Sequence, residues 1–241
     1  TNYEELSRNG VRIISKASGN YIYDEDGNKI LDAMAGLWCV NIGYGREELA
    51  EVAKEQILKL SYYNSFFKTN NIPTAELSEK LSKITPKGLS HSFFANSGSE
   101  ANDTIIRMVR HYWNLEGQPN KRKIIGREYG YHGSTIMSAS MGGMVDMHNQ
   151  SANEADFYHI QAPYSFKYQG NQSNELFSET ASSWLEEKLI ELGSENVAAF
   201  VAEPIQGAGG VIIPPEGYFN HIQKICRKYD ILFIVDEVIT G

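Results

Sequence analysis

A fully apolar stretch, residues 231–235, ends abruptly in two carboxylates, Asp236 and Glu237. Such a stretch predicts a buried strand, and ligands of open α/β sheets bind beyond the carboxyl ends of the strands. A carboxylate placed there can hold Mg²⁺ or keep a ring nitrogen protonated. A magnesium-dependent nucleotide hydrolase also needs a phosphate loop of the form G-x-x-x-x-G-K-[ST], which the sequence lacks. The sequence therefore argues against a nucleotide hydrolase. The alternative to a functional acid is that the two carboxylates are simply solvated at the end of the strand.

Small residues follow a second predicted strand, residues 92–95, just before an amphipathic helix predicted over residues 99–115. The turn between them contains Ser97, Gly98 and Ser99. Glycine lets an anion approach the backbone N–H groups closely, and the dipole of the helix favours negative charge at that end. The pattern predicts a phosphate site, although an ordinary capping box with Ser97 as the N-cap explains the same residues.

An aromatic pair, Tyr131 and His132, stands between Gly130 and Gly133 and comes just after a third predicted strand, residues 123–126. Flanking glycines expose the rings, and an exposed ring can stack on a planar ligand. An ordinary loop in which the tyrosine has only a structural role explains this pattern equally well.

A third carboxylate, Glu203, follows the predicted strand at residues 198–202 and precedes a glycine-rich turn. That turn does not match the dinucleotide fingerprint, because Ile212 stands where the last glycine would be, so a nicotinamide or flavin site is not expected. The six histidines show no ligand spacing on a helix face, and Cys39 and Cys226 match no zinc pattern. We therefore expect no metal site.

The four strand ends are expected along one edge of one sheet. They offer a phosphate cradle, an exposed aromatic ring and two carboxylates. A planar, phosphorylated cofactor whose ring nitrogen must stay protonated accounts for all of them, and pyridoxal phosphate is such a ligand.

The composition is that of a globular protein. The 241 residues include 22 Lys and Arg against 30 Asp and Glu, for a net charge of −8, and 41% are hydrophobic. Nucleic acids and anionic membranes attract positive surfaces, so neither is an expected partner. No apolar stretch is long enough for a membrane span, and two widely separated cysteines fit a reducing compartment, so we expect a cytoplasmic protein.

The predicted elements indicate an α/β fold with a largely parallel sheet. A hairpin is predicted over residues 21–31, followed by helices over residues 47–60 and from residue 74 to before Pro86. Further helices are predicted over residues 99–115, 177–192 and 215–229, with an irregular excursion over residues 146–175. We place a domain boundary between residues 65 and 66.

Four motifs, at residues 96–102, 130–133, 203–207 and 235–241, occur in the order and register of the class III aminotransferases, which are fold type I pyridoxal phosphate enzymes. The resemblance spans nearly the whole chain. It is greatest to the omega-amino acid:pyruvate branch, through the stretch at residues 36–45.

The resemblance implies a large cofactor-binding domain over residues 66–241, with a mostly parallel central sheet and flanking helices. Residues 1–65 would be the N-terminal part of a smaller α+β domain and its linker. It also implies a set of cofactor contacts, at Ser97, Gly98, Ser99, Tyr131, His132, Glu203, Asp236 and Val238. The phosphate would bind at Gly98 and Ser99. Tyr131 and Val238 would lie on opposite faces of the ring, Asp236 would pair with the ring nitrogen, and Glu203 would support these groups by hydrogen bonding. Trp38 and Tyr131 would contact the substrate.

The family's Schiff-base lysine lies downstream of the Asp-Glu-Val motif, and no lysine of this chain occupies that position. The resemblance therefore implies a segment of a longer protein, cut at both ends and inactive alone. The intact protein is expected to be a homodimer that transfers an amino group from an amine or omega-amino acid to a keto acid such as pyruvate. An aminomutase, an ornithine, GABA or diaminopimelate transaminase, and a non-catalytic scaffold of the same fold are the alternatives.

Overall fold

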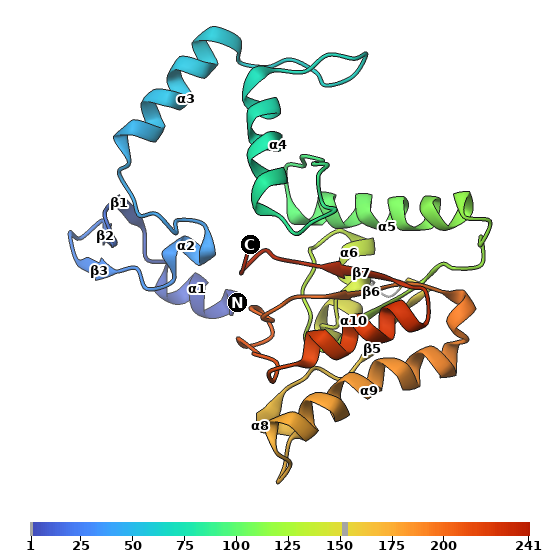
Figure 1. The fold of residues 1–241 in the computed structure, drawn as a ribbon. Coiled ribbons are helices and arrows are strands. Elements are labelled where there is room, and N and C mark those ends of the chain that lie inside the picture. The colour runs from blue at the N-terminus through green and yellow to red at the C-terminus, as the bar shows by residue number, and fades with distance from the viewer. Residues whose placement is uncertain (1, 151–153) are drawn as a thin grey trace. The chain divides into compact units, whose positions relative to one another are not determined.

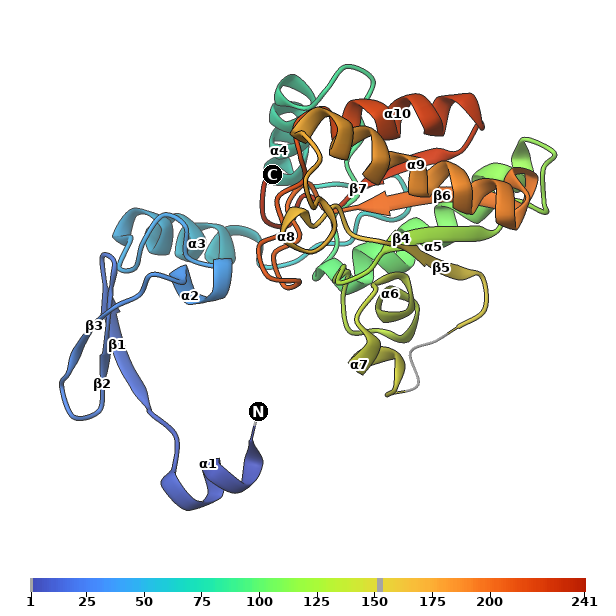
Figure 2. The ribbon, with the colours of Figure 1, turned by 90° about the horizontal axis from the view of Figure 1, so that it is seen from below.

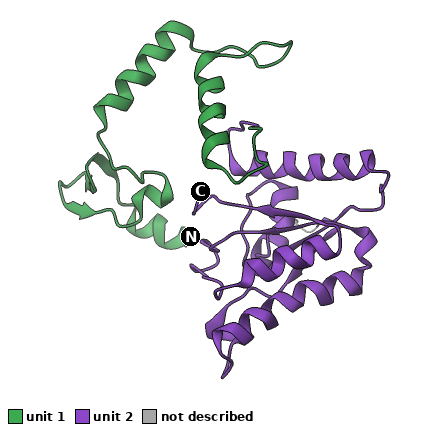
Figure 3. Ribbon diagram, in the orientation of Figure 1, with its two compact units in different colours: residues 1–92 green, residues 93–241 purple. Residues whose placement is uncertain are grey.

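The computed structural model describes residues 2–150 and 154–241, and the chain divides into two compact units, residues 1–92 and 93–241 (Figure 3). The boundary between these units lies later in the chain than the domain boundary predicted at residues 65 and 66. The assignment of residues 66–92 to the large domain stays a prediction.

The first unit combines a small antiparallel sheet with short and medium helices. Its elements are α1 (Tyr3–Asn9), β1 (Ile14–Ser18), β2 (Tyr21–Asp24), β3 (Lys29–Leu31), α2 (Ala35–Trp38), α3 (Glu47–Leu60) and α4 (Ile72–Ile84). The predicted hairpin is confirmed as β2 and β3, and β1, which was not predicted, pairs with β2. The Asp24 carboxylate accepts hydrogen bonds from the backbone and side-chain N–H groups of Asn28 and so closes the turn. Both predicted helices are confirmed, as α3 and α4.

The short element α2 is wound in the left-handed sense. All four of its residues, Ala35 to Trp38, have φ between 49° and 67°. In this conformation the Cβ atom of an L residue crowds the following carbonyl oxygen, at a cost of about 1–2 kcal/mol per residue, and only glycine avoids it. Local hydrogen bonds must therefore hold the turn.

The second unit alternates strands and helices, as the sequence predicts (Figure 1). Its helices are α5 (Gly98–Leu115), α6 (Ile136–Met141), α7 (Val145–His148), α8 (Ser165–Tyr168), α9 (Asn174–Leu192), the 3₁₀ turn η1 (Ser194–Asn196) and α10 (Tyr218–Lys228). Its strands are β4 (Lys123–Arg127), β5 (Phe157–Ile160), β6 (Val197–Ala202) and β7 (Leu232–Val235). In the described part of the unit these strands form one parallel sheet in the order β5-β4-β6-β7, which confirms the α/β fold.

Helices cover both faces of the parallel sheet, with α9 and α10 on one face and α5 and α6 on the other (Figure 2). All six residues of β6 are buried. Phe200 packs among the apolar side chains of α9 and α10, and Val201 packs on the other face with Ile106 of α5. The Trp113 indole N–H donates to the carbonyl of Ala198 at 2.9 Å and ties α5 to the central strand. The core thereby fixes where β4, β6 and α5 end.

Two predictions of secondary structure are corrected. The strand predicted over residues 92–95 does not form, because Phe93 and Phe94 are exposed and no strand among the described residues pairs with them. The predicted excursion over residues 146–175 contains the strand β5 and the short helix α8. The run Phe157–Ile160 has only four residues, and a run this short cannot be distinguished from a loop by its sequence pattern alone.

Candidate functional site

A cavity of about 290 Å³ lies at the carboxyl end of the parallel sheet, within the second unit. Its walls come from the start of α5, from the loop after β4 and from the segment after β7. The lining residues are Ser97, Gly98, Ser99, Asn102, Tyr131, His132, Gly133, Asp236 and Val238. Three of the four motifs that we predicted at one sheet edge therefore meet in this cavity, and the fourth, at Glu203, does not line it.

The start of α5 serves both as a capped helix end and as a cavity wall. The Ser97 side chain accepts a hydrogen bond from the backbone N–H of Glu100, and the Glu100 carboxylate accepts one from the backbone N–H of Asn96. The capping interpretation is thus confirmed. The backbone N–H groups of Gly98 and Ser99 find no acceptor among the described residues, and they stand at the positive end of an 18-residue helix. This end of the cavity can therefore bind an anion.

The loop after β4 packs closely against the same helix end. A Cβ atom at Gly133 would lie 2.5 Å from the Ser99 hydroxyl oxygen and 2.8 Å from the Ser99 Cα atom, so no side chain fits there. The Ser99 hydroxyl oxygen accepts a hydrogen bond from the backbone N–H of Ser134 at 2.9 Å. Its own O–H is thereby left to donate into the cavity.

Asp236 supplies the acid of the cavity, and three groups donate hydrogen bonds to it. These groups are His132 Nδ1 at 2.8 Å, Asn102 Nδ2 at 3.2 Å and the backbone N–H of Val238 at 3.3 Å. Burial opposes ionisation, but the hydrogen bonds from His132 and Asn102 outweigh it and lower the pKa of Asp236 below its ordinary value. A carboxylate that stays ionised inside a cavity can pair with a protonated ring nitrogen. Glu237, by contrast, is exposed and bonds only to the Thr240 hydroxyl and to backbone groups near it.

Glu203 lies behind the cavity wall and is buried. Its two carboxylate oxygens accept hydrogen bonds from the backbone N–H groups of Tyr131, at 3.0 Å, and Gly207, at 3.2 Å. Burial raises the pKa of Glu203, and the buried guanidinium of Arg127, which donates to the Glu203 carbonyl, partly opposes that rise. Glu203 therefore holds the Tyr131 loop, which fits the supporting role that we expected. It does not itself line the cavity, and its direct contact with a cofactor stays a prediction.

The remaining predicted residues divide between the two units. Tyr131 is 38% exposed and Val238 67% exposed, so both present surface to a ligand. Trp38 belongs to the first unit and is 47% exposed. Its contact with a substrate stays a prediction.

Sequence reasoning missed Asn102, whose amide N–H group also donates to the His132 carbonyl at 2.7 Å. We expected the inward face of α5 to run through Ala101, Ile105, Val109 and Tyr112 or Trp113. Val109 and Trp113 are buried as predicted, but in the first half of the helix the buried side chains are Asn102 and Ile106. The signal was the asparagine itself, because a polar side chain in register with three buried apolar ones needs a buried partner.

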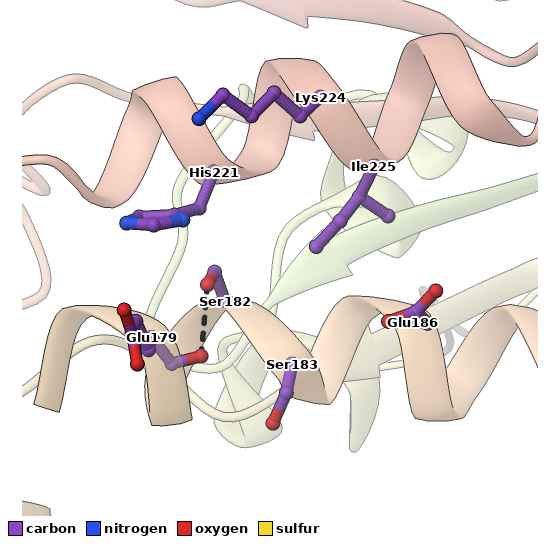
Figure 4. A pocket seen from close by; sticks show the side chains of 7 residues that line it. All are labelled: Glu179, Ser182, Ser183, Glu186, His221, Lys224 and Ile225. Carbon is purple, nitrogen blue, oxygen red and sulfur yellow. Dashed lines mark hydrogen bonds between the residues drawn. The ribbon is translucent and has the colours of Figure 1, made fainter. Parts of the chain in front are cut away.

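A second hollow lies between α9 and α10, and its lining mixes acidic side chains with His221 and Lys224 (Figure 4). Within it the Ser182 hydroxyl donates to the carbonyl of Glu179 at 2.9 Å, which satisfies that group locally. None of the motif residues lines this hollow, so it is not the predicted site.

Two kinds of site are absent from the described residues. No three or more His, Cys, Asp or Glu side chains gather in an arrangement that could hold a metal ion. None of the described helices combines the length and apolar character required to cross a membrane.

Comparison with known proteins gives consistent relatives. The chain is 54% identical to a putrescine–pyruvate aminotransferase of Pseudomonas aeruginosa over 246 residues, with 100% of this chain and 53% of the relative covered. It is 44% identical to a mitochondrial gamma-aminobutyrate transaminase of Oryza sativa, with 95% of this chain and 45% of the relative covered. The chain thus spans about half the length of these relatives.

Solved structures give the same result. An (S)-enantioselective omega-transaminase of Thermomicrobium roseum superposes with a TM-score of 0.96 at 41% identity, and an omega-transaminase of Pseudomonas jessenii in complex with PMP superposes with 0.96 at 42%. Both matches cover 100% of this chain and 54% of the solved one. The family model for class-III aminotransferases matches residues 3–241. The chain therefore belongs to the class-III aminotransferase family.

Proposed function

We propose that the protein is a pyridoxal phosphate-dependent aminotransferase that moves an amino group from an amine or omega-amino acid to a keto acid such as pyruvate. One observation carries this proposal. The cavity joins an anion-binding helix end, at Gly98 and Ser99, to a carboxylate, Asp236, that is held ionised by three hydrogen bonds. A phosphate and a protonated ring nitrogen on one ligand match these two ends.

The residues of the cavity fit that cofactor. Gly98 and Ser99 would hold its phosphate through backbone N–H groups and the Ser99 hydroxyl, and the Tyr131 ring and Val238 would contact its planar ring. Asp236 would keep the proton on the ring nitrogen, with His132 and Asn102 orienting the carboxylate. When bound, pyridoxal phosphate supplies an electron sink for negative charge at the substrate carbon. Glu203 would keep Tyr131 in place without exchanging protons with the substrate.

The choice of amine belongs to the same proposal. The relatives named above include a putrescine–pyruvate and a gamma-aminobutyrate aminotransferase, so the chemistry is shared and the donor differs. The similarity to a putrescine–pyruvate aminotransferase and to omega-transaminase structures favours an omega-amine donor with pyruvate as acceptor. Trp38 would form an apolar wall of the substrate pocket.

We also propose a homodimer in the cytoplasm. Large apolar side chains of α3 and α4 are not buried by other residues of the range 2–92. Leu58 and Ile84, for example, are each 80% exposed. A second copy of the chain would cover them, since large exposed apolar patches are typical of protein interfaces. Both cysteines are free, as expected in a reducing compartment. Light scattering of the full-length protein at several concentrations would give a dimer mass, and a stable monomer would contradict this part.

The experiment that tests the function is an assay of the full-length protein loaded with pyridoxal phosphate. Putrescine, gamma-aminobutyrate and 1-phenylethylamine are each offered with pyruvate, and alanine is measured. We expect alanine to form with at least one of these amines. No alanine from any of them, with pyridoxal phosphate shown by its absorbance to be bound, would overturn the proposal. With stoichiometric pyridoxal phosphate, the 241-residue chain alone should yield no adduct at a single defined lysine after borohydride reduction.

A further inference from the structure

The left-handed turn α2 has an unusual backbone for its sequence. Ala35, Leu37 and Trp38 have φ of 49°, 60° and 67°, and only Gly36, at 60°, adopts that conformation without strain. The turn is closed by its own hydrogen bonds, from the backbone N–H groups of Trp38 to Met34 and of Cys39 to Ala35. Strained backbone of this kind persists only where surrounding groups determine it, and it gathers at binding sites.

Two polar side chains hold the turn. The Asp32 carboxylate oxygen Oδ2 accepts a hydrogen bond from the backbone N–H of Gly36 at 2.7 Å and from the Tyr44 hydroxyl at 2.7 Å. The hydrogen bond from Tyr44, followed by those from the backbone, lowers the pKa of Asp32, so the acceptor is ionised at neutral pH. Space is equally constrained, since a Cβ atom at Gly36 would lie 2.9 Å from Val40 Cγ2 and 3.0 Å from the Tyr44 hydroxyl oxygen.

The strained conformation does not bury the side chains of the turn. Leu37 is 65% exposed and Trp38 47% exposed, so neither side chain contributes to a core within the first unit. The strained backbone fixes the direction of the Trp38 Cα–Cβ bond, and therefore the point from which the exposed indole extends. A wall of a binding pocket needs such fixed geometry, because an aromatic side chain that moves freely excludes nothing.

We propose that Asp32 and Tyr44 are positioning residues that set the place of Trp38 and thereby determine which amines the enzyme accepts. This inference rests on the proposed function, in which Trp38 lines the substrate pocket. The fixed indole would distinguish two classes of amine. Short aliphatic diamines would pass the indole and pack against it, whereas bulky arylalkylamines would be excluded.

The test compares Tyr44→Phe, Asp32→Ala and Gly36→Ala with Trp38→Ala in the full-length holoenzyme. Tyr21→Phe and Asp26→Ala are the matched controls, because neither of those side chains has a hydrogen bond to the turn among the described residues. The kcat and KM values are measured for putrescine and for 1-phenylethylamine, with pyruvate as acceptor. We expect Tyr44→Phe to raise KM for putrescine about three- to tenfold with kcat within about twofold, as expected for the loss of one hydrogen bond. The ratio of kcat/KM for 1-phenylethylamine to kcat/KM for putrescine should rise, as it should in Trp38→Ala.

A second measurement does not depend on activity. Hydrogen exchange of a peptide covering residues 33–40 should become at least about tenfold faster in Tyr44→Phe than in Tyr21→Phe, because Asp32 then loses the partner that fixes its oxygen. Unchanged exchange would overturn the inference even if Asp32→Ala fails to fold.

The outcomes separate the two proposals. If Trp38→Ala changes neither KM nor preference, the role given to Trp38 is wrong, and the inference falls with it while amino transfer stands. If Trp38→Ala changes the preference but Tyr44→Phe and Gly36→Ala do not, the inference alone is wrong. A fall in kcat by the same factor for both amines, with KM unchanged, would indicate a general structural role and would also overturn it.

Discussion

The two units of the chain differ in how their structure is held (Figure 3). In the described part of the first unit, residues 2–92, Asp24 is the one buried side chain, and it is polar. In the second unit, apolar clusters fill both faces of the parallel sheet, with Phe200 and Leu185 fully buried. Local hydrogen bonds therefore shape the first unit, whereas a core of its own shapes the second.

This difference explains where the candidate site lies. A cofactor cavity needs several side chains from distant parts of the chain at fixed positions, and only a packed core supplies that rigidity. Asn102, His132 and Asp236 lie up to 134 residues apart in sequence and yet share hydrogen bonds. The strained turn at Trp38, in the first unit, depends on two neighbouring side chains within 12 residues.

The largest expected effect comes from exchanging the same residue type in each unit. Leu185→Ala should lower the free energy of unfolding of the 241-residue chain by about 2–5 kcal/mol, because it leaves a cavity in the core. Leu89→Ala, at a 63% exposed position of the first unit, should change it by less than about 0.5 kcal/mol. Urea unfolding followed by circular dichroism measures both. Equal losses for the two variants would remove the contrast between the units.

Within the second unit, Asn102→Leu should be the next largest change. The substitution keeps the branched shape but leaves the His132 carbonyl without its donor and removes one of the two donors to Asp236 Oδ2, at about 1–3 kcal/mol of unfolding free energy. Asn114→Leu, at an exposed position on the same helix, is the matched control. An Asn102→Leu variant as stable as the control would show that the network does not hold the cavity.

The contribution of Asp236 to stability should depend on pH. Its folded pKa is lowered from an ordinary value of 3.8, so the carboxylate stabilises the fold at pH values above about 4, and that contribution is lost as the pH falls through the folded pKa. The difference in unfolding free energy between wild type and Asp236→Asn should shrink as the pH falls below about 4 and through the folded pKa, by at most about 1.4 kcal/mol per pH unit. Urea titrations at several pH values measure this. A difference that is flat or grows on acidification would mean that the hydrogen bonds at Asp236 do not favour its ionised form.

The smallest effect concerns the ring of Tyr131. Tyr131→Phe should leave the affinity of the full-length protein for pyridoxal phosphate within about twofold, whereas Tyr131→Ala should weaken it about three- to tenfold, because stacking needs the ring and not the hydroxyl. Equilibrium dialysis with each variant gives the two values. A larger loss in Tyr131→Phe than in Tyr131→Ala would contradict the stacking role.

Elements with a strong apolar pattern were predictable from the sequence, and those that depend on distant partners were not. The run before Glu203 is a strand that is buried on both faces, which a continuous apolar run indicates directly. The run before Asp236 also forms a strand and pairs with β6, but it is half-buried and Val235 is exposed, so the prediction of a buried strand was wrong there. The run at Phe93 and Phe94 has the same appearance but remains exposed, so pattern alone could not reveal that no strand pairs with it.

The site was predictable as a set of residue types but not as a network. Tyr131 and Asp236 could be placed at one sheet edge because parallel strands bring their carboxyl ends together. Gly98 and Ser99 reach the same cavity at the start of α5, although the strand predicted before them does not form. The bridge through Asn102 depends on which side chains in the first half of α5 face the sheet, and packing against the sheet decides this. Gly36 was the one residue in the sequence that could have indicated the left-handed turn. The other three residues of the turn, an alanine, a leucine and a tryptophan, disfavour that backbone conformation.

The role of Asp236 is the central claim, and turnover by the full-length protein tests it most directly. The kcat for amino transfer to pyruvate should fall about 100-fold or more in Asp236→Asn, as expected for loss of a charged hydrogen-bond partner worth roughly 3 kcal/mol. Glu237→Gln, which changes the neighbouring exposed carboxylate, should stay within about threefold of wild type. Nearly full turnover in Asp236→Asn, or an equal loss in both variants, would contradict the assignment of this cavity as the cofactor site.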